Sequence, residues 1–259
     1  MMISLQKRLF LLRSYTNNRP AERDHMGTTG IIGGTVFLGN RLLDSLEEKV
    51  TQTEFGSARV LVSGDFIYIP RHGVSRERHI LPHCINHLAN IRALKDLGVS
   101  EILGICSTGS LRKDIPPGTL VIADDFISMI PGLTTVTENP LHIAPVLDEG
   151  LRQHLITTAS RCRVPVRERG VYWQTQGPRF ETRAEIRMMA QFADIVGMTM
   201  ASEAIIAGEM NIPYAAVCSV DNYGHGIGDG TLTVDEIVEG SRKNADAVLA
   251  IITAYVSER

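Results

Sequence analysis

The chain has 259 residues, of which 44% are hydrophobic and 21% are charged. This length corresponds to one or two domains with a large core, and the composition excludes collagen-like, low-complexity and largely disordered proteins. The formal net charge of −3 lacks the basic excess that is typical of nucleic-acid-binding proteins. The four cysteines lie far apart in the sequence and form no metal-ligand spacing, which predicts reduced thiols in a cytoplasmic protein rather than disulfides or structural zinc.

Residues 1–28 are predicted to form a flexible N-terminal extension, with a targeting role as the alternative. Their apolar patch, Leu9–Leu12, is too short for the core of a signal peptide, and Glu22 and Asp24 do not suit a transit peptide. No membrane association is expected, because the most apolar stretch, Ala201–Val220, is interrupted by charged residues such as Glu203.

From Gly30 onward, short apolar runs alternate with amphipathic segments, a pattern typical of α/β proteins. The turn Ser63-Gly64-Asp65 between two apolar runs predicts a hairpin, so we expect a mixed sheet flanked by helices in a single domain over residues 29–259. The expected strands are Gly30–Gly33, Arg59–Val62, Phe66–Pro70, Ile102–Cys106, Leu120–Ala123, Gly170–Gln174, Ile195–Gly197 and Tyr214–Val220.

Three helices are predicted from periodicity and capping signals. Apolar residues recur at helical spacing from Ile85 to Leu94, ahead of a C-cap glycine, Gly98. Two capping boxes, Thr182 with Glu185 and Thr233 with Glu236, start two further helices. The last helix begins at Val234 and carries one apolar stripe that includes Ile237, Val238, Ala245, Val248, Leu249 and Ile252.

Three turns that follow predicted strands carry groups suited to an anion. Backbone N–H groups, hydroxyls and a guanidinium all bind phosphate well. Ligands gather at the carboxyl ends of strands in α/β sheets, so these turns are expected to form one site. The dinucleotide fingerprint and the P-loop lysine are absent, and each turn on its own also fits a plain tight turn or surface pair. The turns are Gly33-Gly34-Thr35, Arg71-His72-Gly73 and Cys106-Ser107-Thr108-Gly109-Ser110-Leu111.

Five motifs together resemble the purine nucleoside phosphorylase and 5′-methylthioadenosine phosphorylase family. The resemblance extends from Gly30 to the C-terminus. It implies one α/β domain, usually in a homotrimer or a dimer of trimers, and cleavage of a purine nucleoside by inorganic phosphate. Phosphate is then a co-substrate, and neither a metal nor an organic cofactor is required. The motifs are Gly30-Ile31-Ile32-Gly33-Gly34-Thr35, Arg71-His72-Gly73, Gly109-Ser110-Leu111-Arg112, Gly177-Pro178-Arg179-Phe180-Glu181-Thr182 and Gly197-Met198-Thr199.

The resemblance also assigns roles to individual residues. It implies Asn222 and His72 as catalytic residues and Met198 as a residue beneath the ribose. Two positions depart from the family pattern: Cys106 replaces a Thr or Asn, and Val36 replaces a glycine, which puts the strength of phosphate binding in doubt. The implied phosphate-binding residues are Thr35, Arg71, His72, Ser107 and Thr199.

The residues at the purine position indicate a 6-oxopurine. Glu181 follows Phe180 where 6-oxopurine enzymes carry Glu, and its carboxylate accepts the N1–H of hypoxanthine or guanine. Asn222 stands where methylthioadenosine enzymes carry Asp, and its amide suits O6 and N7. The alternatives are a helix-end charge for Glu181 and a loop cap for Asn222, and Asp221 is the alternative match for the catalytic position.

The residues at the 5′ position indicate a methylthio group. Val234, Ile237 and Val238 stand where a histidine binds the 5′-hydroxyl in inosine and guanosine enzymes, although the same spacing serves a helix core. With Glu181 and Asn222, they favour 5′-methylthioinosine as the substrate. His142 matches a residue that methylthio enzymes contribute to a neighbouring subunit.

Several alternative functions remain at this stage. Methylthioadenosine phosphorylase and inosine or guanosine phosphorylase are the nearest. A nucleosidase would use water in place of phosphate with Asp221 as the general base, and a non-catalytic nucleoside-binding homologue would follow from the departures at Cys106 and Val36. A Rossmann oxidoreductase is disfavoured because the glycine fingerprint is missing.

Overall fold

A computed structural model describes residues 27–34, 46–74, 79–130, 132–135, 142–228 and 233–258, without the side chains of residues 234–236. Short β-branched and aliphatic runs form strands, and amphipathic segments form helices. The strands are β1 (Thr28–Gly33), β2 (Glu47–Thr53), β3 (Gly56–Val62), β4 (Phe66–Pro70), β5 (Val99–Ser110), β6 (Leu120–Ile122), β7 (Asp125–Ser128), β8 (Val166–Arg167), β9 (Val171–Gln174), β10 (Ile195–Gly197) and β11 (Tyr214–Tyr223). The helices are α1 (His87–Asp96), α2 (Glu149–Arg161), α3 (Arg183–Met189), α4 (Met200–Glu209) and α5 (Val234–Ser257), with a short 3-10 helix at Pro82–Cys84.

The strands of the described residues form one mixed sheet in the order β2-β3-β4-β1-β5-β10-β9-β7, and β11 pairs with β5 and β6. Its centre is parallel, because β1 pairs in parallel with β4 and β5, and β5 pairs in parallel with β11. The β2–β3–β4 segment is antiparallel. The central strands therefore end at the same edge of the sheet.

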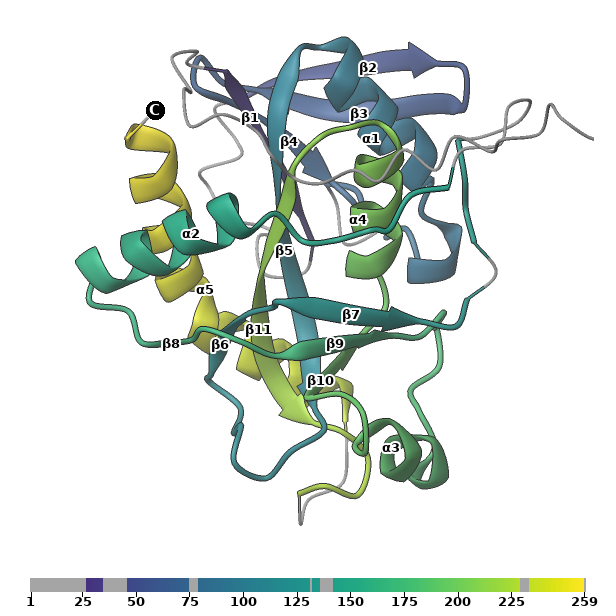
Figure 1. The fold of residues 1–259 in the computed structure, drawn as a ribbon, viewed down its shortest axis with the longest axis vertical. Helices are drawn as coiled ribbons and strands as arrows, with labels where there is room; N and C mark the ends of the chain where they lie inside the picture. The colour runs from purple at the N-terminus through teal and green to yellow at the C-terminus, as the bar shows by residue number, and fades with distance from the viewer. Residues whose placement is uncertain are drawn as a thin grey trace, which may run out of the picture.

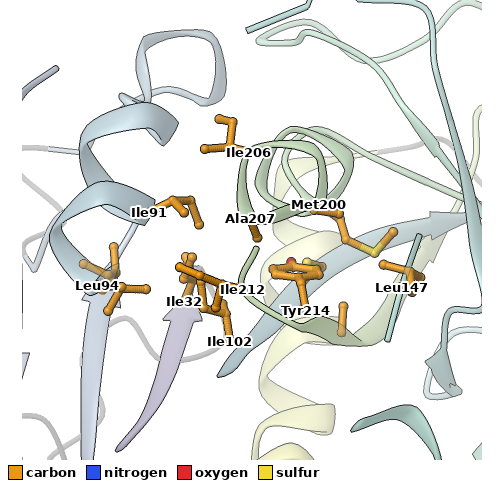
Figure 2. Packing of buried hydrophobic residues seen from close by; sticks show 14 of the residues in the cluster. Ile32, Ile91, Leu94, Ile102, Leu147, Met200, Ile206, Ala207, Ile212 and Tyr214 are labelled. Carbon is orange, nitrogen blue, oxygen red and sulfur yellow. The ribbon is translucent and has the colours of Figure 1, made fainter. Parts of the chain in front are cut away.

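Helices cover both faces of the sheet (Figure 1). On one face, α1 and α4 pack on residues such as Ile32 and Ile102. Figure 2 shows this layer, with Ile91 of α1 and Ile206 and Ala207 of α4 above the strands. On the other face, α2 and α5 pack on Leu103 and neighbouring residues, and α3 covers a smaller cluster. The core thus holds the strand ends in fixed positions.

The predicted fold class is confirmed, and all eight predicted strands are present, several of them longer than expected. The hairpin turn is confirmed by the bond from the Ser63 N–H to the Phe66 carbonyl. The Thr182–Glu185 capping box is also confirmed, and Gly98 has a φ of +80° after α1. That helix begins at His87 rather than Ile85, because Asn86 caps it by accepting the Ala89 N–H.

Some elements were not predicted, namely β2, β7, β8, α2, α4 and the 3-10 helix. Helix α5 begins at Val234 as predicted, but the side chain of Glu236 in the second capping box lies outside the described residues. No helix in the described part of the chain is long and apolar enough to cross a membrane.

Candidate active site

The carboxyl ends of β1, β4, β5, β10 and β11 surround a pocket of about 560 Å³. The three turns predicted to form one site all contribute to it, which confirms their convergence. Gly33 pairs with Pro70 in the parallel β1–β4 ladder, so Gly34 and Arg71 leave the sheet side by side. Ten residues predicted for the site line this pocket: Arg71, His72, Ser107, Phe180, Glu181, Met198, Thr199, Asn222, Ile237 and Val238.

Four other residues singled out in the sequence are not seen in the pocket. Thr35 and Val36 lie outside the described residues, and so does the side chain of Val234. His142 is exposed and is not among the lining residues of its own chain, so its contribution to a neighbouring subunit stays a prediction.

Gly34 allows the first turn to pass directly over Arg71 and His72. A Cβ added at Gly34 would lie 3.0 Å from Cδ2 of His72 and 3.4 Å from Nη1 of Arg71. Because the glycine lacks this atom, its backbone can approach both side chains. The close approach brings the backbone of β1 and the two polar side chains of the second turn to one wall.

Arg71 is held in a buried ion pair that the sequence did not predict. Its Nε lies 2.8 Å from Oε1 of Glu203, and its Nη2 donates to Oε2 at 2.9 Å. The guanidinium also donates to the carbonyls of Ile105 and Ile32. Burial would lower the pKa of Arg71, but the Glu203 carboxylate raises it above its usual value, so the guanidinium stays charged. The pocket therefore has a fixed cation in its wall.

His72 is neutral near pH 7 and its tautomer is set by the backbone. Burial, with smaller contributions from Arg71 and His79, lowers its pKa to about 4, against the hydrogen bond to the Ile80 carbonyl, which raises it. That carbonyl lies 2.7 Å from Nδ1, and because it can only accept, Nδ1 carries the proton. Nε2 is then an acceptor on the side of Gly34. His79, a lining residue that was not predicted, stacks on the His72 ring with centroids 4.8 Å apart.

Cys106 lies beneath the pocket rather than in its wall. It is buried, and its Sγ is 3.9 Å from Nη1 of Arg71. A hydrogen bond with Cys218, its register partner on β11, is the largest cause that lowers the pKa of Cys106, and Arg71 and Thr199 lower it as well. The residue that departs from the family pattern here therefore contacts the Arg71 guanidinium and does not line the pocket itself.

Asn222, and not Asp221, faces the pocket. Asp221 is only 2% exposed and is not a lining residue, whereas Asn222 is half-buried and lines the pocket. The Nδ2 of Asn222 donates to the Tyr223 carbonyl at 2.8 Å, which leaves Oδ1 for a ligand. The alternative match at Asp221 is thus disfavoured, as is its use as a base toward a water in the pocket.

Glu181 is oriented by Thr175. The Thr175 hydroxyl donates to Oε1 of Glu181 at 2.7 Å, and the carboxylate is 8% exposed at the pocket wall. Phe180, which is 41% exposed, lines the same side. An oriented carboxylate beside an aromatic ring can accept an N–H from a flat heterocycle.

Thr199 stands at the start of α4, where backbone N–H groups favour an anion. Its own N–H donates to the Tyr172 hydroxyl at 3.1 Å, which fixes the first turn of α4, and its side chain does not cap the helix. Met198, the residue before it, is packed against Gly177. This arrangement puts Thr199 and Met198 at adjacent points of the wall.

The face of α5 completes the pocket with Ile237, Val238, Ser241 and Arg242. Ser241 and Arg242 were not predicted, although they follow Ile237 and Val238 by four residues and so lie on the same helix face. Leu81 and Pro82 close another part of the wall and gave no signal in the sequence. In the part of the chain that is described, no group of His, Cys, Asp and Glu residues could hold a metal ion.

Comparison with known proteins agrees with this geometry. A model of the phosphorylase superfamily matches residues 28–257. The chain belongs to this superfamily. It is 42% identical over 234 residues to a probable 6-oxopurine nucleoside phosphorylase of Archaeoglobus fulgidus, covering 88% of this chain and 96% of the relative. It is 35% identical over 243 residues to a probable S-methyl-5′-thioinosine phosphorylase of Methanocaldococcus jannaschii, covering 88% and 91%.

A solved structure is also similar. Methylthioadenosine phosphorylase from Schistosoma mansoni in complex with adenine aligns with a TM-score of 0.79 and 29% identity over 90% of this chain and 91% of that one. The family resemblance carried by the five sequence motifs is therefore confirmed.

Proposed function

We propose that this protein cleaves purine nucleosides with inorganic phosphate, and that 5′-methylthioinosine is its favoured substrate. The products are hypoxanthine and 5-methylthioribose 1-phosphate. The main support is that one pocket contains a charged, buried Arg71 with Ser107 and Thr199 as well as Glu181 and Asn222. Relatives named as 6-oxopurine nucleoside phosphorylase and S-methyl-5′-thioinosine phosphorylase support the same activity.

The reaction follows from the charges that this pocket provides. Breaking the glycosidic bond leaves a cation-like ribose, and a phosphate held beside Arg71, His72 and Thr199 stabilises that charge as it approaches C1′. The purine leaves with electron density on its imidazole ring, and Oδ1 of Asn222 accepts the hydrogen bond of N7 once N7 is protonated. We assign Asn222 and His72 as catalytic residues on this basis.

The base preference rests on Glu181. The Oε1 of this carboxylate already accepts from Thr175, so the remaining oxygen accepts N1–H of a 6-oxopurine. Adenine has a lone pair at N1 and would leave the carboxylate unpaired. S-methyl-5′-thioadenosine phosphorylases are also among the relatives, at 37% identity for the protein of Thermofilum pendens, so 5′-methylthioadenosine is the substrate to compare.

The preference for a 5′-methylthio group rests on the apolar part of α5. Ile237 and Val238 present aliphatic surface to the pocket, and Val234 begins the same helix. Apolar side chains pack a thioether well but give no partner to a hydroxyl. Inosine and guanosine are therefore expected to be poorer substrates.

Further properties follow from this function. Phosphate is a co-substrate and no metal or organic cofactor takes part. The protein acts in the cytoplasm in purine salvage, without nucleic-acid or membrane partners, as a homotrimer or a dimer of trimers in which His142 of each chain contributes to a neighbouring site.

A panel of nucleosides at saturating phosphate tests the substrate assignment. The value of kcat/KM is expected to be highest for 5′-methylthioinosine, ahead of 5′-methylthioadenosine, inosine and guanosine. A higher value for 5′-methylthioadenosine would overturn the base assignment, and a higher value for inosine would overturn the assignment of the 5′ pocket.

A further inference from the structure

Asp221 is a buried carboxylate that the proposed reaction does not use. It lies behind the pocket wall, on β11, and its partners among the described residues are uncharged: the hydroxyls of Ser107 and Ser219 and the amide of Asn244. Ser107, from β5, is the one partner that also lines the pocket. The bond between Ser107 Oγ and Asp221 Oδ2 is 2.5 Å long, so the carboxylate and the pocket share one hydroxyl.

The direction of each bond in this network is determined. The Nδ2 of Asn244 donates to Ser219 Oγ at 2.7 Å, and the Ser219 hydroxyl therefore donates its proton to Oδ1 of Asp221. Asn244 Nδ2 also approaches Oδ1 at 3.2 Å. The two hydrogens of Nδ2 are shared among Ser219, Oδ1 and the Val220 carbonyl, which lies 3.1 Å away. Since Oδ1 already accepts the Ser219 proton, a proton on Asp221 is placed on Oδ2, facing Ser107.

The protonation state of Asp221 therefore decides what Ser107 offers to the pocket. While Asp221 is ionised, Ser107 donates its single O–H to Oδ2 and presents only lone pairs to a ligand. When Asp221 is protonated, Oδ2–H donates to Ser107, whose own proton is then free to point into the pocket. The same hydroxyl is an acceptor in the first state and a donor in the second.

We propose that Asp221 is a positioning residue that turns Ser107 into an acceptor, so that the pocket selects an oxyanion carrying a proton, such as hydrogen phosphate, over one carrying none, such as sulfate. This inference rests on the proposed function, because it takes Ser107 as a contact of the phosphate. A P–O–H group satisfies the Ser107 lone pair, whereas a sulfate oxygen meets it with another lone pair, an unpaired contact that costs binding.

The selectivity is expected to weaken at low pH. Burial raises the pKa of Asp221 to about 6, against the hydrogen bonds from Ser107, Ser219 and Asn244. None of these partners titrates in this range. Arg71 stays charged throughout and the pKa of His72 is lowered to about 4, while His79 and Glu181 are further titratable side chains of the pocket wall. The Asp221→Asn variant keeps all of these groups, so it separates their effect on the pH dependence from that of Asp221. Sulfate, which keeps its charge from pH 5 to 8.5, should therefore bind more tightly below about pH 6.

Calorimetric titration of the full chain with phosphate and with sulfate, without nucleoside, tests the inference. For the unmodified protein at pH 8 we expect phosphate to bind at least about tenfold more tightly than sulfate. Asp221→Asn places an amide N–H opposite Ser107, because its oxygen takes the Oδ1 position, and so mimics the protonated carboxyl. This variant should bind sulfate about tenfold more tightly relative to phosphate, with a flatter pH dependence.

Ser107→Ala is the second variant and does not depend on the Asp221 substitution. If Ser107 is an acceptor, Ser107→Ala weakens the binding of phosphate and leaves the binding of sulfate equal or tighter at pH 8. If Ser107 is a donor, the same substitution weakens the binding of both anions. Equal weakening of both anions in Ser107→Ala, or an unchanged sulfate-to-phosphate ratio in Asp221→Asn, would overturn the inference. If Asp221→Asn acted only by removing a negative charge, it would tighten the binding of both anions equally. A change in the ratio of the sulfate and phosphate affinities therefore reports the changed role of the Ser107 hydroxyl and not the lost charge.

The two proposals fail in different ways. If base release does not depend on phosphate, the proposed phosphorolysis is wrong, whatever the anion titrations give. If release depends on phosphate but the unmodified protein binds sulfate as well as phosphate at pH 8, the phosphorolysis stands and the role of Asp221 is wrong.

Discussion

Arg71 contacts a buried carboxylate and also faces the anion pocket, so its substitution affects stability as well as binding. Arg71→Ala is expected to raise the KM for phosphate by roughly 30-fold or more, because a charged hydrogen bond to a desolvated phosphate contributes about 2–4 kcal/mol. It should also lower the free energy of unfolding by about 3–5 kcal/mol, because Glu203 is left as an unpaired buried charge. Steady-state kinetics and urea unfolding measure the two effects.

A double variant separates these effects. Arg71→Met with Glu203→Leu replaces the pair by apolar groups of similar volume, which commonly restores stability in buried ion pairs. We expect it to recover most of the unfolding free energy but not the KM for phosphate. Recovery of both would show that Arg71 acts only as a structural residue.

The choice of base is also a property of single residues. Asn222→Asp is expected to shift kcat/KM toward 6-aminopurines, and Glu181→Ser should reduce the preference for 6-oxopurines by about 1–3 kcal/mol, or roughly 5- to 150-fold. Thr175→Val is the matched control, because it releases Glu181 without removing its carboxylate and should relax the preference less. Parallel assays with methylthioinosine and methylthioadenosine measure the ratio, and an unchanged ratio in Glu181→Ser would remove that residue from base selection.

For single residues, the sequence predicted many of the side chains that line the pocket but not the buried carboxylates that pair with them. Arg71 and Glu181 stand in recognisable motifs, and both line the pocket. Glu203 is 132 positions from Arg71, and Asp221 is 114 positions from Ser107, in segments where a single acidic residue has no distinguishing pattern. Such pairs depend on which strands and helices meet, so they follow only from the three-dimensional fold.

Among the elements, α2 packs on the sheet through apolar residues and is also linked to it by the hydrogen bonds of one buried arginine. Arg152 is 1% exposed, and it donates to the carbonyl of Ala123 at 2.7 Å and to that of Glu168 at 2.5 Å. Arg152→Ala leaves these carbonyls unpaired and a cavity beside them, which should lower the free energy of unfolding by about 3–5 kcal/mol.

The control on the same helix is Arg161→Ala. The Arg161 side chain is 53% exposed and pairs with Glu258, so its loss should cost no more than about 1 kcal/mol. Urea denaturation of both variants gives the comparison. Similar values for the two would contradict the role assigned to Arg152.

The start of α5 determines the 5′ preference in this account. Val234 is the first residue of the helix whose face lines the pocket. Val234→His is expected to narrow or invert the ratio of kcat/KM between methylthioinosine and inosine, which we expect to be roughly 10- to 100-fold in the unmodified protein. Glu239→His, at an exposed position of α5, is the control and should keep the parent ratio. If Val234→His also keeps the parent ratio of kcat/KM between methylthioinosine and inosine, Val234 is only a residue of the helix core.

The elements that were predicted and those that were missed differ in their sequence patterns. Strands such as β4 are short apolar runs, whereas β2 is mostly exposed and rich in charged residues such as Glu47 and Glu48, so it shows no buried face. Helix α4 is apolar on most sides because it packs on the sheet and beside α1. Its sequence therefore merges with β11 into the one apolar stretch Ala201–Val220.

For the whole molecule, the parallel centre of the sheet is the feature that produces the site. The parallel strands β4, β1, β5 and β11 come from distant parts of the sequence and end at one edge, and helices on both faces hold them there (Figure 1). Strand β10 runs antiparallel to β5 and adds Met198 and Thr199 to the same pocket. The convergence of the turns was predictable from the rule for α/β sheets. The family resemblance also predicted Ile237 and Val238 of α5 in the site, but not Ser241 and Arg242, because these two residues also fit a solvent-facing helix surface.

The dependence of base release on phosphate tests the central claim most directly. Purified full-length protein is incubated with 5′-methylthioinosine in phosphate buffer and in phosphate-free buffer, and the base and sugar products are identified by chromatography. We predict release of hypoxanthine that saturates with phosphate, together with stoichiometric 5-methylthioribose 1-phosphate. Equal release of hypoxanthine without phosphate, with free 5-methylthioribose as the sugar product, would show that the enzyme is a hydrolase and would contradict the account.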